Sequence, residues 1–238
     1  MMRRSLAAAA LGVTAAIALG GAALAFTPTI NGSFENGTYA DNGAGFDTLP
    51  AASTALTGWT VGGSGIDWIG TLWTAADGTK SLDLNAAAPG SISQTFATTI
   101  GRTYVVTFAL SGNPQGDLGA KTLNVSATGG PTTSYTFNTS TAANTVTNMK
   151  WTSQSYSFVA TSASTTLTFT STTAGAYGPA LDNVVVTEKA GPNRAMMSAC
   201  KHGGWKAMTD GHGHHFKNQG DCVSFYATGG RNLGSRTP

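Results

Sequence analysis

Short runs in which every second residue is apolar recur through the chain, and this period of two constrains the fold more than any other feature. Clusters of Gly, Asn, Pro and Ser separate the runs, as expected for turns between half-buried antiparallel strands. The intervening residues are mostly Thr and Ser, a composition that favours sheets over long helices. We therefore predict an all-β sandwich. The runs are residues 81–84, 92–96, 104–110, 122–126, 134–137, 155–159 and 166–169.

Residues 177–186 predict a turn followed by a closing strand. Pro179 fixes φ in the turn, and the three consecutive valines from Val184 favour a buried pleated surface. Asp182 stands at the start of this apolar strand, where a carboxylate must be solvated, hydrogen-bonded or bound to a cation. The first and last strands of a sandwich often lie side by side. Glu35, which follows Phe34 between two glycine turns, is therefore the expected companion of Asp182.

The N-terminal residues 1–25 are predicted to be a secretory signal peptide. Arg3 and Arg4 precede an alanine-rich apolar run that ends in small residues at Ala23 and Ala25. A membrane anchor is the alternative, but the run is dominated by Ala and Gly and ends in a cleavage-type motif. No later stretch is long and apolar enough to span a bilayer. We expect a secreted, extracellular protein that has no membrane span after signal removal.

Charge divides the remaining chain into two units. Residues 26–188 carry 4 basic and 9 acidic residues, net −5, whereas residues 189–238 carry 7 basic and 2 acidic residues, net +5. A Gly-Pro-containing stretch at this boundary predicts a linker over residues 189–198. We therefore predict a sandwich domain over residues 26–188 and a basic tail over residues 199–238 that is too small to fold without a covalent constraint.

Six motifs in the sandwich region carry a resemblance to a known family. Together they resemble the bacterial choice-of-anchor C domain, which is similar to the plant cell-wall proteins of the domain of unknown function 642. The resemblance implies a jelly-roll β-sandwich, galactose-binding-like and of the carbohydrate-binding-module type, that is exported and often held at the cell surface. It implies no particular ligand. The motifs are residues 31–35 (NGSFE), 56–61 (LTGWTV), 66–70 (IDWIG), 81–85 (SLDLN), 92–96 (ISQTF) and 177–184 (YGPALDNV).

The tail departs from that family pattern, because it has neither a sortase-type motif nor a terminal apolar helix. It contains Cys200 and Cys222 and resembles a short cysteine-paired tail found on some exported actinobacterial proteins. Two cysteines in an exported chain most simply form a disulfide, so we predict a Cys200–Cys222 bond. The alternative is a zinc or copper site that uses His212, His214 and His215, which lie between the cysteines.

Several classes of chemistry are disfavoured. All four histidines lie in the tail, so the sandwich has no residues for a Ser-His-Asp site. No phosphate-binding motif is present, and the net charge of −5 argues against nucleic acid. Asp67, Asp77 and Asp83 could act as paired carboxylates that cleave a glycosidic bond. The Asp77-Gly78 pair has a turn context, however, and we predict that the protein is not an enzyme.

The aromatic residues indicate where a ligand could bind. Flat rings beside amide side chains hold sugars by stacking and hydrogen bonds. The rings exceed the needs of a small core: they are Trp59, Trp68, Trp73, Trp151, Tyr39 and Tyr177. We assign Trp59 to the core, leave Trp68 open between core and surface, and place the rings of Trp73 and Tyr177 in exposed loops. The predicted ligand-binding residues are therefore Trp68, Trp73, Tyr177 and Asn85.

Three functions follow from these features. The first is an exported, non-enzymatic module that binds a polysaccharide or cell-wall glycan or interacts with another surface partner. The second is a structural protein of the cell envelope or matrix that binds protein partners. The third is a weak glycan-active enzyme. An exposed aromatic platform beside amide groups would favour the first function, and a flat surface without rings would favour the second.

The resemblance also implies a structural Ca²⁺ at Glu35 and Asp182, because jelly rolls of this type often hold an ion between an early Phe-Glu motif and an aspartate in the last strand. Two carboxylates and nearby turn carbonyls suit an ion that takes six to eight oxygens. A bound ion stabilises the folded state by mass action. We expect chelation to lower the Tm and added Ca²⁺ to restore it, as measured by differential scanning fluorimetry.

Glu35→Gln and Asp182→Asn should each abolish the response of the Tm to calcium. The prediction is wrong if protein shown to be metal-free at the start melts at the same temperature with chelator and with calcium.

Overall fold

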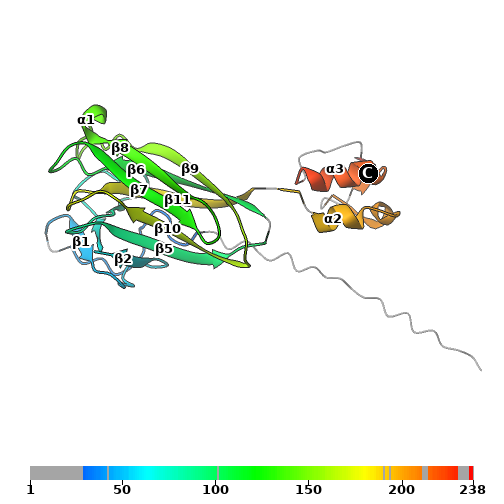
Figure 1. Ribbon diagram of the computed structural model, residues 1–238, viewed down its shortest axis with the longest axis horizontal. Helices are drawn as coiled ribbons and strands as arrows, with labels where there is room; N and C mark the ends of the chain where they lie inside the picture. Colours follow the sequence, from blue (N-terminus) through cyan, green and yellow to red (C-terminus); the bar gives the residue numbers. More distant parts are fainter. Residues whose placement is uncertain are drawn as a thin grey trace, which may run out of the picture.

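A computed structural model of the protein describes residues 29–41, 43–100, 102–189, 191–192, 194–210, 214–229 and 236–237. The predicted signal peptide, residues 1–25, lies outside the described residues, as does His212. Two antiparallel sheets pack face to face, and a smaller helical unit follows them in the chain (Figure 1). No helix in the described part of the chain is long and apolar enough to cross a membrane.

Eleven strands form the sandwich. The first sheet contains, in order, β1 (Phe46–Leu49), β3 (Ile66–Ile69), β4 (Ser81–Asp83), β11 (Pro179–Lys189), β6 (Thr103–Gly112) and β9 (Thr152–Val159). The second contains β2 (Thr60–Gly63), β5 (Gly90–Ala97), β10 (Ser164–Ser171), β7 (Ala120–Ala127) and β8 (Thr132–Asn138), and the short helix α1 (Thr139–Ala142) follows β8. The predicted all-β jelly-roll sandwich is confirmed, and every alternating run falls on a strand. The three short strands β1 to β3 lie outside the predicted alternating runs.

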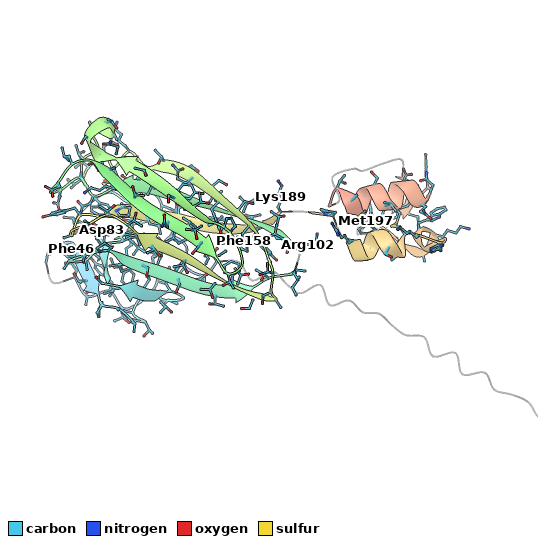
Figure 2. All side chains as sticks on the ribbon, viewed as in Figure 1. Phe46, Asp83, Arg102, Phe158, Lys189 and Met197 are labelled. Atoms are coloured by element: carbon cyan, nitrogen blue, oxygen red, sulfur yellow. A yellow bond between two sulfur atoms is a disulfide. The ribbon has the colours of Figure 1, made fainter. Side chains whose placement is uncertain are left out.

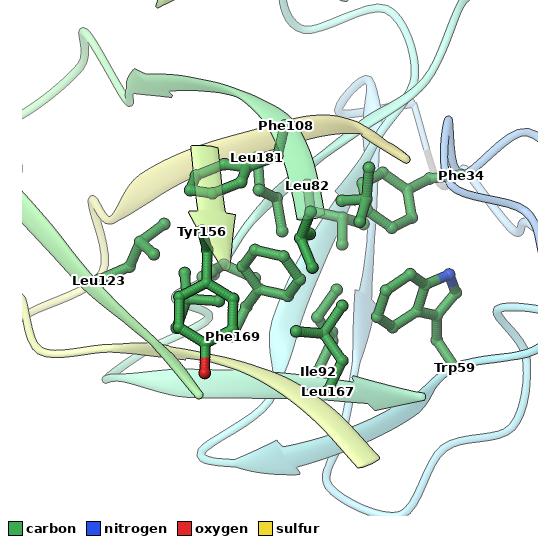
Figure 3. Close-up of a cluster of buried hydrophobic side chains, with 14 of the residues drawn as sticks. Phe34, Trp59, Leu82, Ile92, Phe108, Leu123, Tyr156, Leu167, Phe169 and Leu181 are labelled. Atoms are coloured by element: carbon green, nitrogen blue, oxygen red, sulfur yellow. The ribbon is translucent and has the colours of Figure 1, made fainter. Parts of the chain in front are cut away.

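The core lies between the two sheets, where aromatic and aliphatic side chains from both inner faces meet (Figure 3). Phe169 of β10, for example, is paired with Ile92 of β5 and Val125 of β7, so that three apolar side chains share one face. Each such side chain contributes about 1.5–3 kcal/mol when fully buried. Trp59 belongs to this core, as predicted, and is only 3% exposed. The labelled members are Phe34, Trp59, Leu82, Ile92, Phe108, Leu123, Tyr156, Leu167, Phe169 and Leu181.

The segment before β1 lies beside β11, as expected for the two ends of the domain. The N–H of Val184 donates to the carbonyl of Gly32 at 2.8 Å, and the N–H of Val186 donates to Thr29 Oγ1 at 2.9 Å. A Cβ atom on Gly32 would lie 1.9 Å from the carbonyl oxygen of Val184, so only glycine allows this approach. The strand pairing of β11 with β6 shifts between Asp182 and Val185, which marks a β-bulge.

A buried polar network closes one end of the sandwich. The carboxylate of Asp83 is 1% exposed and accepts hydrogen bonds from Asn113 Nδ2 at 2.8 Å and from the N–H groups of Asn85 and Gly178, both at 3.0 Å. Lys121 Nζ donates to the carbonyl of Tyr177 at 2.7 Å. Burial raises the pKa of Asp83 to about 7, although these hydrogen bonds act in the opposite direction. The network fixes the turn that precedes β11.

The tail is a separate small unit with its own core. It consists of α2 (Arg194–Ala199), the 3₁₀ helix η1 (Gly204–Ala207), β12 (His215–Phe216), α3 (Gln219–Ala227) and β13 (Arg236–Thr237). The predicted disulfide is present, with Cys200 and Cys222 joined at an S–S distance of 2.06 Å and packed with Phe216. Arg102 and Lys189 lie at the end of the sandwich nearest the tail, whereas Met197 lies in the tail (Figure 2).

The predicted linker, residues 189–198, stays a prediction. Helix α2 occupies residues 194–199 of this region. The segment contains Arg, Met and Ala, which are good helix formers.

We expect reduction of the disulfide to loosen the tail and leave the sandwich folded, because both cysteines belong to the core of the tail and neither belongs to the core of the sandwich. Chain-entropy estimates give a loss of about 3 kcal/mol for a loop of this size. Limited proteolysis with and without reductant, followed by mass spectrometry, would show cleavage confined to the tail. Cleavage within the sandwich after reduction would contradict this independence.

The raised pKa of Asp83 predicts how stability depends on pH. A carboxyl group with a folded pKa of about 7 and an ordinary value of 3.8 binds its proton more tightly in the folded state. The free energy of unfolding should therefore fall as pH rises from about 4 through 7. Urea titrations at pH 5 and pH 8 would measure this. Asp83→Asn should reduce the difference, whereas Asp41→Asn at an exposed site should leave it unchanged.

Candidate functional site

The outward face of β9, β6 and β11 carries mostly small, uncharged side chains. Lys189 lies in its last row, opposite Thr103, and Asp182 lies opposite Ala109. In one row, Ser155 of β9 is paired with Thr107 of β6, which is in turn paired with Val185 of β11. Ser, Thr, Ala and Val dominate the outward positions. The large apolar side chains occupy the inward positions of the same strands, where they form the core. The outward residues are Ser153, Ser155 and Ser157 of β9, Val105, Thr107 and Ala109 of β6, and Asn183, Val185 and Thr187 of β11.

Two adjoining depressions lie on this face. The first, of about 250 Å³, is lined by Thr107, Phe108, Ala109, Trp151, Thr152, Ser153, Asn183 and Val185. The second, of about 240 Å³, is lined by Thr29, Gly32, Ser33, Asp77, Asn183, Val184, Val185 and Val186. They adjoin at Asn183 and Val185, which line both, and we call the two depressions together the β11 groove. Asn183 lies at its centre, in the β-bulge, with a φ of 49° that Asn tolerates better than most residues.

Trp151 forms one end of the groove. Its indole Nε1 donates to the carbonyl of Thr74 at 3.0 Å, which fixes the ring against the loop that follows β3. The ring also packs on a second apolar cluster, which lies outside the sandwich core and contains Ile69, Trp73, Met149 and Ala180. Trp151 remains half-exposed, so a rigidly held aromatic surface faces the groove.

Asp77 lines the groove from the loop of residues 74–80, and two carboxylates hold this loop. Asp182 Oδ2 accepts from the N–H groups of Ala76 at 2.7 Å and Asp77 at 3.0 Å. At the far end, Glu35 Oε1 accepts from the N–H groups of Thr79 at 2.8 Å and Lys80 at 2.7 Å. The two predicted companions therefore meet through a shared loop, and their hydrogen bonds place Asp77 at the groove.

The electrostatic environments of the two carboxylates differ. Burial raises the pKa of Asp182 to about 7, against the effect of the backbone N–H groups that it accepts. Partial burial acts in the same direction on Glu35, but hydrogen bonds from Thr79 and Lys80 and the charge of Lys80 outweigh it and lower the pKa. Lys80 Nζ lies 3.9 Å from Glu35 Oε2, an exposed pair of small energetic weight.

The oxygen atoms of Glu35 and Asp182 are not free to act as calcium ligands in this arrangement. Ca²⁺ requires six to eight oxygen ligands, whereas the oxygens of Glu35 and Asp182 already accept N–H or O–H groups. The described ranges contain no group of three or more His, Cys, Asp and Glu side chains that could hold a metal ion. Calcium binding at these residues stays a prediction.

The histidine cluster of the tail also stays a prediction as a metal site. His214 Nδ1 lies 3.0 Å from Asp210 Oδ2, which orients the ring, and His215 is exposed on β12. His212 lies outside the described residues.

The predicted ligand-binding residues do not come together on one surface. Trp73 is only 4% exposed, so its predicted exposure is wrong, and its Nε1 donates to Ser81 Oγ at 2.8 Å. The loop that carries Trp73 folds back onto the outward face of the sheet and buries the ring. Trp68 and Asn85 are both 0% exposed, and Trp68 Nε1 donates to the carbonyl of Phe34 at 2.9 Å. Tyr177 is 40% exposed, in agreement with its predicted loop position.

The three carboxylates that were candidates for glycosidase chemistry do not form one exposed site. Asp67 and Asp83 are paired across β3 and β4, so they lie on one face. Asp83, however, is buried beneath its three hydrogen-bond donors, and Asp67 Oδ1 accepts from Thr48 Oγ1 at 2.6 Å. Asp77 lies apart from this pair, in the β11 groove. This arrangement gives no support to hydrolysis by paired carboxylates.

Sequence reasoning missed two residues that line the groove, Trp151 and Asn183. Trp151 was counted among the surplus rings but was not selected, although it directly precedes an alternating strand and follows Lys150. Asn183 was overlooked because a β-bulge cannot be read from an apolar run. The positive φ of Lys150, 55°, redirects the chain at this point, and only the three-dimensional structure reveals it.

Comparison with known proteins gives a family match and a curated relative. Residues 27–187 match the family model described as Protein of unknown function (DUF642). Halomucin of Haloquadratum walsbyi is 33% identical over 174 residues, which represent 68% of this chain and 2% of the relative. The chain therefore spans only a small part of that relative.

Several solved structures are similar at low identity. A family 16 carbohydrate-binding module-2 is 16% identical, with 67% of this chain and 99% of the module covered and a TM-score of 0.39. A CBM35 from Paenibacillus barcinonensis is 23% identical, with 59% and 98% covered and a TM-score of 0.37. TmCBM61 in complex with beta-1,4-galactotriose is 16% identical, with 66% and 92% covered and a TM-score of 0.36. Values this low carry no conclusion about a shared ligand.

The family match extends over more than half of the chain and includes Asp77, Trp151 and Asn183, whereas the disulfide-closed tail lies beyond it. It confirms the resemblance to the domain of unknown function 642, and the choice-of-anchor C resemblance stays a prediction. The chain belongs to the family described as Protein of unknown function (DUF642).

Proposed function

We propose that this protein is an exported, non-enzymatic module that binds carbohydrate in the β11 groove. The observation that carries the proposal is the combination of a fixed, partly exposed Trp151 ring with the amide of Asn183 and the carboxylate of Asp77 along two adjoining depressions. Aromatic rings stack on the apolar faces of sugars, and amide and carboxylate groups bind sugar hydroxyls.

The arrangement supports binding because its parts are already held in place. Trp151 is fixed by its bond to Thr74, and the backbone of Asp77 is held by its N–H bond to Asp182. A preformed site loses little conformational entropy when a ligand binds. Val185, which is 47% exposed, adds apolar surface to the floor between these two groups.

Tyr177 is proposed as a second contact for glycan, separate from the groove. Its ring lies against Gly116, where a Cβ atom would be 2.1 Å from the ring, and the Lys121 ammonium fixes its carbonyl.

A structural role in which the outward face of β9, β6 and β11 binds a protein partner is the alternative function. That face carries exposed Val185 and Val159, the latter 51% exposed, and one exposed charge, Lys189, which would suit a protein partner.

We expect Trp151→Ala to weaken binding of an uncharged polysaccharide by about 1 to 3 kcal/mol, the usual loss when an aromatic anchor is removed. Affinity electrophoresis through gels that contain β-glucan, galactan or mannan would measure it. Trp151→Phe keeps a ring and should retain most of the binding. Equal Tm values of the variants would show that the fold is intact.

Tyr177→Ala serves as a comparison. If Tyr177→Ala abolishes retention and Trp151→Ala does not, the binding site lies at the turn and the groove is not involved. If no polysaccharide retards the parent protein, carbohydrate binding is wrong and the protein-partner alternative is favoured.

A further inference from the structure

The β11 groove has a defined direction across the sheet. Its floor begins at β9, crosses β6 and β11, and ends at residues 29–33, which lie beside β11 through the Gly32–Val184 hydrogen bond. Three strand spacings of about 4.8 Å give a length of about 15 Å, close to that of three pyranose units. Trp151 lines the depression over β9 and β6, and Asp77 lines the depression beside residues 29–33.

Charge along the groove is carried by one residue. Of the residues that line the two depressions, Asp77 is the only one with an ionisable side chain. No Lys, Arg or His of the described residues lies within ion-pair distance of its carboxylate, because Lys80 is directed to Glu35 instead. Lys150 is exposed beside Trp151 but does not line the groove. A ligand carboxylate or phosphate would therefore meet an unneutralised negative charge.

Resting on the proposed function, we propose that the ligand of the groove is an uncharged glycan segment of about three units and that Asp77 determines this specificity. Trp151 stacks on a sugar at one end, and Val185 contacts the middle of the segment. Asp77 accepts hydrogen bonds from sugar hydroxyls at the other end and repels polyanionic glycans. Specificity of this kind combines an attractive contact with a repulsive one.

The charge test uses pairs of polymers that differ in charge alone. Hydroxyethylcellulose, galactan and mannan are each compared with a carboxylated derivative of the same polymer, at low ionic strength where charge effects are largest. We expect the uncharged member to bind at least about 10-fold more tightly than its carboxylated partner. Asp77→Asn should reduce this ratio several-fold, and Asp77→Lys should reverse it.

Asp117→Asn provides the matched control. It removes the same unit of charge from an exposed loop that lines neither depression, so it should leave the ratio unchanged. Equal effects of Asp77→Asn and Asp117→Asn would overturn the role of Asp77. Tighter binding of the carboxylated polymers by the parent protein would overturn the uncharged ligand class.

The length of the segment is tested with mono-, di-, tri- and pentasaccharides of whichever uncharged polymer binds. We expect affinity to rise up to about three units and then change by less than about 3-fold. A monosaccharide that binds as tightly as the trisaccharide would overturn the extended segment. Failure of the proposed function itself would look different, since no polymer of either charge would bind, or Trp151→Ala would bind like the parent.

Discussion

The carboxylate of Asp182 is the interaction on which the rest of the site depends. It lies at the start of the closing strand, is fully buried, and accepts N–H groups from Ala76, Asp77 and Asn183. A buried carboxylate without partners would cost several kcal/mol, so these three donors make its position tolerable. Through them one side chain fixes both the loop that carries Asp77 and the bulged residue at the centre of the groove.

The second apolar cluster gives the face its shape. A sheet with small outward residues is flat, and a flat face offers a ligand few contacts. Here the loops around Trp73 and Met149 pack on the outward side chains of Ile69 and Ala180 and cover one end of the sheet. Trp151 packs on the same cluster and lines the groove beside it.

Different interactions hold the first residues of the sandwich and the turn before its last strand. Thr29 and Gly32 bond to β11 through backbone and hydroxyl groups, whereas the buried network of Asp83 and Lys121 fixes the turn before β11. The tail has its own disulfide and its own small core and contributes no residue to the β11 groove. The family match ends at residue 187, close to the end of β11, which agrees with this division.

Sequence alone determined the strands, because the period of two reflects which side chains face the core, and each alternating run from residue 81 onward lies on a strand. It also determined that Trp59 is buried. It did not determine which aromatic side chains reach the surface. Trp73 and Trp151 both lie outside regular strands, yet the first is buried and the second is half-exposed. That difference arises where two loops distant in sequence pack on one sheet face, and a local pattern contains no information about such packing.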